Sequence, residues 1–548
     1  MLRHGGKILI DQLVIEGVER VFCVPGESYL AALDGLHGSP IQTVVCRHEG
    51  GAAMMAEAHG KVTGSPGVAF VTRGPGATNA SSGVHVAFQD STPMVLFIGQ
   101  VASDQRDREA FQEVDYRRMF APLAKWVAEI DRVERIPEYV SQAFHVAMSG
   151  RPGPVVLALP EDMLSASATV GDVLPARPAL PRATADDAAR ILEALSRSTK
   201  PFVVVGGSLW SPDASAALTA FAAAHELPVG AVFRRQDRLD NDHPCYVGDL
   251  GLGINPALAE KVKQSDLLLV LGSRLGEVAT SSYSLIGIPD PGKPLIHVHV
   301  DADEIGRVYR PSLGIVATPD SMLAALNALP VPPAPVWREW TKQLRRDYEA
   351  WNAPQPTPGA VKMEAIVAHL SSVLPPDTIV TNGAGNFSAW LHRYHRYRRP
   401  RTQLAPTSGS MGYGLPAAVA AKLARPNQIV VCYAGDGDFQ MTMQEFGTAV
   451  QYGANIVVIV CNNGMYGTIR MHQERHYPQR VSGTELVNPD FAVLARAYGA
   501  PSWTVTETSQ FPEALEKAVA SDQPALIELR LDPRALSPRL VLDLPDTN

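Results

Sequence analysis

The pattern that most constrains this fold lies in the last third of the chain. An apolar run at 428–433 predicts a buried strand that ends in a Gly-Asp-Gly turn around Asp436. A helix is predicted over 441–451, and a second apolar run at 455–461 predicts a strand that closes in an Asn-Asn-Gly turn around Asn463. A strand–turn–helix–strand unit of this length suits a parallel βαβ crossover. Both turns then fall at the carboxyl ends of parallel strands, where open α/β sheets bind ligands.

The two turns offer a consistent set of ligands. Asp436 contributes a carboxylate and Asn463 an amide oxygen, and the neighbouring glycines leave the backbone accessible. Such oxygen donors suit a hard divalent cation that shares its coordination shell with phosphate oxygens. Taken singly, either motif also fits an ordinary strand-to-loop turn, since Asp, Asn and Gly are common turn residues. Two such turns, each preceded by a strand, favour the cation site.

Strand-like runs alternate with helix-length segments along the chain. This alternation predicts an α/β protein whose parallel sheets carry helices on both faces. For 548 residues, a prior of about 100–200 residues per domain suggests roughly three doubly wound domains. A proline-rich stretch at 173–182 reads as one linker, and the stretches 331–337 and 352–359 together read as a second; the polar tail after Asp532 reads as a surface extension. The expected domains are residues 1–170, 185–330 and 358–532.

Composition excludes several classes of partner. The net charge is −8, with acidic and basic residues interspersed, whereas a nucleic-acid footprint is basic and clustered. No apolar run approaches the roughly 18–20 residues of a membrane span, and the N-terminus lacks the features of a signal peptide. The five cysteines are scattered and mostly lie in or beside apolar strands, which predicts buried free thiols in a reducing cytoplasm. We therefore expect a cytoplasmic protein that binds small molecules, neither nucleic acid nor membrane.

Two motifs in the first domain add to the pattern around Asp436. They are RHEGGAA at 47–53 and TRGPGATN at 72–79. Together the three segments resemble thiamine-diphosphate enzymes of the acetohydroxyacid (acetolactate) synthase-like family, over about residues 5–530. The resemblance implies a pyrimidine-binding domain, a central Rossmann-like domain and a diphosphate-binding domain. It also implies that Asp436, Asn463 and the carbonyl of Met465 hold Mg²⁺ against the diphosphate of thiamine diphosphate.

Glu49, within the first of these motifs, is the candidate catalytic carboxylate. From the residues alone it reads as a helix N-terminal acid favoured by the helix dipole. The resemblance instead implies that Glu49 hydrogen-bonds the aminopyrimidine ring of the cofactor and stabilises its imino tautomer, whose nitrogen removes the proton of the thiazolium carbon. The resulting ylide attacks a keto carbon, and the cofactor then acts as electron sink for decarboxylation. Such a role favours an apolar environment and a raised pKa for Glu49.

The resemblance assigns further cofactor contacts in the third domain. Met411 would form the apolar wedge that holds the cofactor bent, although a plain core position fits that residue equally well. The carbonyl of Gly409 would bind the pyrimidine, and the backbone N–H groups of Gly437 and Asp438 would face the diphosphate. The full set of these contacts is Gly385, Asn386, Phe387, Gly409, Met411, Gly437, Asp438 and Tyr466.

Gln112 and Lys125 match positions that line the substrate side in this family, although Lys125 also reads as an ordinary surface lysine. Glu27 stands where acetohydroxyacid synthases usually carry glycine; it is either an additional active-site acid or a helix cap. Arg73 replaces a small polar residue and offers a bidentate partner for a substrate carboxylate. His472 occupies the place of a tryptophan that shapes the pocket for the second substrate. The expected catalytic set is therefore Glu49, Gln112, Glu27 and Arg73.

The central domain departs from the resemblance. Segments 233–242 and 272–283 differ in kind from the flavin-contacting segments of acetohydroxyacid synthases, which weighs against retained FAD. In this family the catalytic glutamate of one subunit meets the diphosphate domain of another. A homodimer or homotetramer with active sites between subunits is therefore implied.

The favoured function is decarboxylation of a 2-oxo acid with carboligation, dependent on thiamine diphosphate and Mg²⁺ and similar to acetolactate synthase. A decarboxylase or C–C lyase acting on another keto substrate is the alternative, suggested by Glu27, Arg73 and His472. A dinucleotide-dependent oxidoreductase is disfavoured, because no strand is followed by G-x-G-x-x-G with a later ribose-binding acid. A catalytically silent binding subunit is disfavoured by the presence of Glu49 and Asp436.

Overall fold

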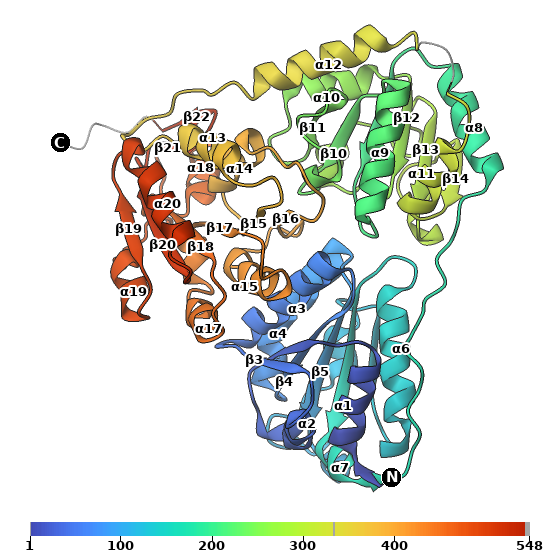
Figure 1. Cartoon of the computed structure of the whole chain (residues 1–548), viewed down its shortest axis with the longest axis vertical. Helices are drawn as coiled ribbons and strands as arrows, with labels where there is room; N and C mark the ends of the chain where they lie inside the picture. The colour runs from blue at the N-terminus through green and yellow to red at the C-terminus, as the bar shows by residue number, and fades with distance from the viewer. Residues whose placement is uncertain (1, 332–334, 543–548) are drawn as a thin grey trace.

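The computed structural model describes residues 2–331 and 335–542, and it contains three six-stranded parallel sheets, each flanked by helices (Figure 1). The predicted α/β class with three doubly wound domains is thereby confirmed. The strand orders are β3-β2-β4-β5-β7-β6, β11-β10-β9-β12-β13-β14 and β16-β15-β17-β18-β20-β19. Strands that are buried on both faces explain why their sequences read as continuous apolar runs.

The N-terminal domain (blue to cyan in Figure 1) holds the first sheet. Its strands are β2 (Arg20–Cys23), β3 (Gln42–Val45), β4 (Gly67–Val71), β5 (Met94–Gln100), β6 (Trp126–Glu129) and β7 (Pro154–Pro160). Its helices are α1 (Gly5–Ile15), α2 (Leu30–Leu36), α3 (Glu49–Thr63), α4 (Pro75–Asp90), α5 (Tyr116–Phe120), α6 (Ile136–Met148) and α7 (Glu161–Ser165). The short strands β1 (Arg3–His4) and β8 (Ser167–Ala168) pair antiparallel as a separate two-stranded sheet.

The central domain (green in Figure 1) is reached through residues 169–184, which form neither helix nor strand, as a linker should. Its strands are β9 (Pro201–Val205), β10 (Val229–Val232), β11 (Tyr246–Leu250), β12 (Leu267–Leu271), β13 (Leu295–His299) and β14 (Leu313–Val316). Its helices are α8 (Ala185–Ser196), α9 (Pro212–His225), α10 (Pro256–Gln264) and α11 (Pro319–Asn327). Of the second predicted linker, residues 332–334 lie outside the described residues, and helix α12 (Arg338–Trp351) separates its two proline-rich parts.

The C-terminal domain (orange to red in Figure 1) holds the pattern around Asp436. Its strands are β15 (Ile379–Asn382), β16 (Gln403–Leu404), β17 (Val430–Gly435), β18 (Val457–Asn462), β19 (Ser502–Val505) and β20 (Ala525–Arg530). Its helices are α13 (Met363–Val373), α14 (Phe387–Tyr394), α15 (Gly414–Ala424), α16 (Asp436–Gln440), α17 (Glu445–Gln451), α18 (Gly467–His476), α19 (Phe491–Ala497) and α20 (Phe511–Ala520). One buried hydrophobic cluster spans the first and third domains, where α3 packs against α15.

Two sequence predictions in this domain need correction. The helix expected over 441–451 begins only at Glu445, as α17, because residues 441–444 form a turn in which the hydroxyl of Thr442 donates to the carbonyl of Gly412 at 2.7 Å; the separate helix α16 precedes this turn. The tail after Asp532 is not merely a surface extension. Its residues form the hairpin β21 (Ala535–Ser537) and β22 (Leu540–Val541), which buries Leu536.

Two further predictions concern the state of the cysteines and the absence of a membrane span. All five cysteines are free and buried, as predicted. No helix within 2–331 and 335–542 combines the length and the apolarity that a membrane crossing needs.

Candidate active site

A cavity of about 210 Å³ lies in the C-terminal domain, at the carboxyl edge of its sheet. Strands β15, β17 and β18 are adjacent and parallel, so the loops that follow them meet at this edge. All of the residues predicted in this domain to contact a cofactor or metal line the cavity: Gly385, Asn386, Phe387, Gly409, Met411, Asp436, Gly437, Asp438, Asn463, Met465 and Tyr466. The fold thus brings these eleven residues to one cavity.

Asp436 follows β17 directly and is only 3% exposed. Its Oδ1 accepts the N–H of Gly437 at 2.8 Å, and its Oδ2 accepts the N–H of Gly464 at 2.8 Å. Burial raises the pKa of Asp436, and these N–H groups act in the opposite direction. Asp436 is thus a buried carboxylate that lines the cavity and is hydrogen-bonded to the turn after β18. In this position it could bind a cation in the cavity.

The donors near Asp436 fit a magnesium ion. Asn463 follows β18 and offers an amide oxygen, and Met465 offers a backbone carbonyl two residues later. These are all oxygen donors, which is the chemistry that Mg²⁺ prefers. Gly437 lets the ring of Tyr466 pack closely against the backbone here, because a Cβ at that position would lie 2.6 Å from the ring.

Asn488 is a site residue that sequence reasoning missed. Its Nδ2 donates to Asp436 Oδ2 and to Asn462 Oδ1, both at 2.8 Å, and so it fixes the orientation of the carboxylate. Asn488 also accepts from the side chain of Gln440 at 2.9 Å. No local signal predicts this role. Asn488 lies in a segment without helix or strand, and only the tertiary fold brings it next to Asp436 at the end of β17.

Asp438 joins two loops of the cavity. Its Oδ1 accepts the N–H of Gly412 at 2.8 Å and the N–H of Ala384 at 3.1 Å. Burial raises the pKa of Asp438 to about 7, while the two N–H groups and Arg234 act to lower it. The carboxylate of Asp438 therefore has a structural role, because it links the loop after β15 to the loop that carries Met411.

Met411 is half-buried and lines the cavity, and it belongs to none of the buried hydrophobic clusters of the described residues. This agrees with an apolar wedge and disfavours a plain core position. Across the cavity, the N–H of Asn386 donates to the hydroxyl of Thr468 at 2.9 Å. Leu536, from the C-terminal hairpin β21–β22, also lines the cavity, so the segment after Asp532 forms part of the site.

Glu49 opens α3 in the N-terminal domain, beneath a cap formed by His48 Nδ1, which accepts the N–H of Gly50 at 3.0 Å. The Oε2 of Glu49 accepts from Asn79 Nδ2 at 2.9 Å, so the two predicted motifs of this domain meet. Glu49 is half-buried and is absent from the lining of the cavity around Asp436. Within one chain, the fold does not bring this carboxylate to that cavity.

Glu445, at the start of α17, is a second residue that sequence reasoning missed. Its Oε1 accepts the backbone N–H of Arg47 at 3.1 Å and that of His48 at 3.0 Å. Its Oε2 accepts from the hydroxyl of Thr448 at 2.6 Å. The C-terminal domain thereby fixes the loop that leads into Glu49.

Three residues predicted on the substrate side lie close together near the carboxyl end of β4, in the first sheet. Arg73 follows β4, and its guanidinium donates to Glu161 at 2.9 Å. Glu27, with 68% of its side chain exposed, lies 3.8 Å from the same guanidinium. Gln112 packs against Gly74 beside them. Arg73 thus already has an acidic partner, and the turn that starts at Glu27 has no side-chain cap, so the capping alternative for Glu27 is wrong.

His472 and Lys125 lie away from the cavity around Asp436. His472 is exposed on α18 and stacks on His476, with ring centroids 6.3 Å apart. Lys125 precedes β6, and its ammonium group donates to the carbonyls of Val146 and Ser149. Burial lowers the pKa of Lys125 to about 8.

Comparison with known proteins agrees with this geometry. Models of thiamine pyrophosphate enzymes match the chain in three parts: the N-terminal TPP binding domain at residues 3–119, the central domain at 188–326 and the C-terminal TPP binding domain at 383–529. The acetolactate synthase isozyme 2 large subunit of Escherichia coli is 32% identical over 541 residues, which cover 96% of each chain. The acetolactate synthase large subunit of Lactococcus lactis is 31% identical over 96% of this chain and 92% of its own. The chain therefore belongs to the thiamine pyrophosphate enzymes, in the family that includes the acetolactate synthases.

Proposed function

We propose that this chain decarboxylates a 2-oxo acid and joins the remaining acyl group to a second carbonyl compound, in the manner of an acetolactate synthase. The observation that carries the proposal is a cavity lined by all eleven residues that the family resemblance assigns to the cofactor or its metal in the C-terminal domain. Thiamine diphosphate, when bound, supplies a carbanion that adds to a keto carbon and takes up the electrons released with CO₂.

The chain's own residues would hold the two ends of this cofactor. Asp436, Asn463 and the carbonyl of Met465 would bind Mg²⁺ and so neutralise a diphosphate. Gly409 and Met411 would hold the pyrimidine, with Met411 as the apolar wedge. Further contacts would come from Gly385, Asn386, Phe387, Gly437, Asp438 and Tyr466.

We also propose that the active site lies between two chains. Glu49 would hold a proton at the pyrimidine ring of a cofactor bound by a partner subunit, which is supported by its absence from the lining of its own chain's cavity. The chain would then act as a homodimer or homotetramer. A cytoplasmic location is proposed with it, because five buried free thiols suit a reducing compartment.

The cluster of Glu27, Arg73 and Gln112 would lie on the substrate side. Arg73 would bind the substrate carboxylate only by sharing its guanidinium with Glu161, which lies 2.9 Å away. The exposed acid Glu27 beside that guanidinium favours a second candidate function. With a proton donor there, the acyl group would leave as an aldehyde, and the enzyme would be a decarboxylase or C–C lyase.

Incubation with pyruvate, Mg²⁺ and thiamine diphosphate tests the proposed reaction. We expect two pyruvate molecules to disappear for each CO₂ released, with acetolactate as the product measured by colorimetry or NMR. Omission of thiamine diphosphate, and addition of EDTA, are the controls that should abolish turnover. Release of CO₂ with an aldehyde would favour the decarboxylase instead. Failure to bind thiamine diphosphate in calorimetry would refute both.

Asn488→Ala should weaken Mg²⁺ binding without removing a ligand. The variant loses the 2.8 Å hydrogen bond that orients Asp436, and such supporting contacts change metal affinity by about 10–100-fold. We expect the Mg²⁺ concentration for half-maximal activity to rise by about tenfold, while kcat at saturating Mg²⁺ falls little. Asn455→Ala is the matched control, since the side chain of Asn455 donates to the exposed Asp522 at 2.6 Å, away from the cavity lining. Equal Mg²⁺ dependence in the two variants would contradict the assignment.

A further inference from the structure

Arg234 reaches from the central domain into the C-terminal domain. It follows β10, has a positive φ of 59° and is 2% exposed. One of its terminal nitrogens donates to the carbonyl of Gly383 at 2.8 Å, and the other donates to the carbonyl of Pro406. No carboxylate of the described residues forms an ion pair with Arg234. Asp90 and Asp438 stabilise its charge only from beyond ion-pair distance. A buried cation whose hydrogen bonds go to two carbonyls is costly, and this cost calls for a reason beyond stability.

The two carbonyls belong to the two loops that line the cavity. Gly383 begins the loop that carries Asn386, and Pro406 begins the loop that carries Met411. Asp438 binds the N–H groups of Ala384 and Gly412 in the same two loops, at 3.1 and 2.8 Å. A cation from the central domain and an anion from the C-terminal domain thus link the same pair of loops, one through carbonyls and the other through N–H groups.

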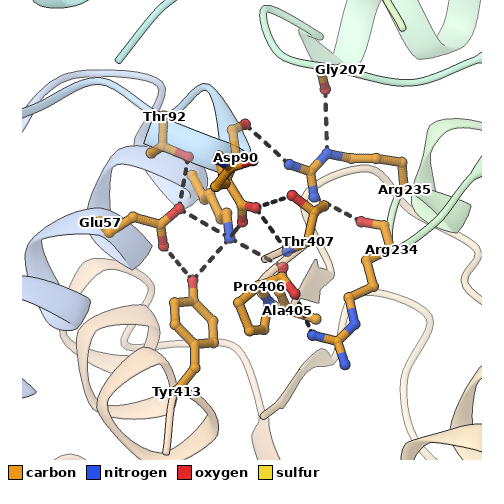
Figure 2. Close-up of polar contacts among 12 residues, drawn as sticks. Glu57, Asp90, Thr92, Gly207, Arg234, Arg235, Ala405, Pro406, Thr407 and Tyr413 are labelled. Carbon is orange, nitrogen blue, oxygen red and sulfur yellow. Dashed lines mark hydrogen bonds and ion pairs between the residues drawn. The ribbon is translucent and has the colours of Figure 1, made fainter. Parts of the chain in front are cut away.

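The N-terminal domain holds the second loop as well, as Figure 2 shows. Asp90 accepts the N–H of Thr407 at 2.7 Å and also its hydroxyl. Tyr413, at the far end of the loop, donates to Glu57 at 2.6 Å. Lys61 donates to the carbonyl of Ala405 at 3.1 Å. Side chains of the other two domains therefore hydrogen-bond to both ends of this loop. The middle of the loop, with Gly409 and Met411, lines the cavity.

We propose that Arg234 is a positioning residue, through which the central domain sets the separation of the two cofactor loops. The inference rests on the proposed function, in which one loop holds the pyrimidine and the other contacts the diphosphate. It assigns a role in the reaction to a domain that adds no residue to the cavity lining, since all lining residues fall between Ala384 and Leu536. A two-pronged guanidinium suits this task, because it spans two acceptors with fixed geometry.

Three variants test the inference on the full-length enzyme. Arg234→Met removes both donors, and Arg234→Lys keeps the charge but offers one point donor in place of the fork. Arg238→Met is the matched control, since Arg238 is another largely buried arginine of the same segment, and its guanidinium binds Asp237 and the carbonyl of Gly207, both in the central domain. The measurements are the Kd of thiamine diphosphate by calorimetry, kcat and KM for pyruvate, and the thermal unfolding temperature.

We expect Arg234→Met to raise the Kd of thiamine diphosphate and lower kcat by at least about tenfold each, with little change in KM for pyruvate. Arg234→Lys should recover part of both losses. Arg238→Met should lower the unfolding temperature by a similar amount while the Kd stays as in the wild type.

A wild-type Kd and kcat in Arg234→Met, with only the unfolding temperature lowered, would overturn the inference and leave the proposed function standing. Should Arg234→Met fail to fold, a wild-type Kd and kcat in folded Arg234→Lys would overturn it equally. Failure of the wild-type enzyme to bind thiamine diphosphate would instead refute the proposed function, and the inference with it.

Discussion

Glu49→Gln should lower turnover by about 10²–10⁴-fold while thiamine diphosphate stays bound. The amide keeps a hydrogen-bonding group at the start of α3, where the carboxylate now accepts from Asn79 at 2.9 Å. It cannot exchange a proton with the pyrimidine ring, and proton transfer is the contribution that the proposed mechanism requires of this residue. The measurements are kcat with pyruvate and the Kd of thiamine diphosphate by calorimetry.

The control for this variant addresses the alternative role of Glu49 as a helix N-terminal acid. Glu138 is also an acid in the first turn of an N-domain helix, α6, and it pairs with Arg135 at the surface. If Glu49 served only the helix dipole, Glu49→Gln and Glu138→Gln would both lose a little stability and neither would lose turnover. A wild-type kcat in Glu49→Gln would therefore refute the catalytic assignment.

The residues around Asp436 were predictable because their signal is local. Each apolar run of β17 and β18 gave a strand, and parallel pairing of neighbouring strands brings the turns after them to one edge. The start of the helix expected over 441–451 was misplaced by four residues for the opposite reason. The hydroxyl of Thr442 bonds Gly412 in a distant loop, and no window of sequence contains that partner. Asn488 is hidden in the same way, since only tertiary folding brings it to Asp436.

The N-terminal domain shows the same division. The motifs at 47–53 and 72–79 identify Glu49 and Arg73, and the fold brings Glu49 to Asn79. The guanidinium that Arg73 could offer a substrate is already paired with Glu161, which lies 88 positions later in the chain. The sequence therefore identified Arg73 but did not reveal that Glu161 is its ion-pair partner. The distance of Glu49 from the cavity of its own chain raises a question of assembly that variants in two chains can answer.

Mixed dimers of Glu49→Gln and Asp436→Ala should recover activity that neither variant has alone. Asp436→Ala removes the buried carboxylate proposed as a metal ligand, so each homodimer carries two defective sites. If each site combines Glu49 of one chain with Asp436 of its partner, a mixed dimer holds one doubly defective site and one intact site. Purified mixed dimers, obtained by co-expression with two different affinity tags, should then show about half of the wild-type kcat per dimer.

The same experiment separates this arrangement from a site within one chain. In a site built from a single chain, the Glu49→Gln chain lacks the acid and the Asp436→Ala chain lacks the metal ligand, so mixing restores nothing. Turnover in the mixed dimer thus requires that Glu49 act across the interface. The control is a mixed dimer of Glu49→Gln with Glu138→Gln: it contains one wild-type-like chain in catalytic residues and should show about half activity under either arrangement. An inactive first pair beside an active second pair would place Glu49 and Asp436 in one chain's site, and the proposed assembly would fall.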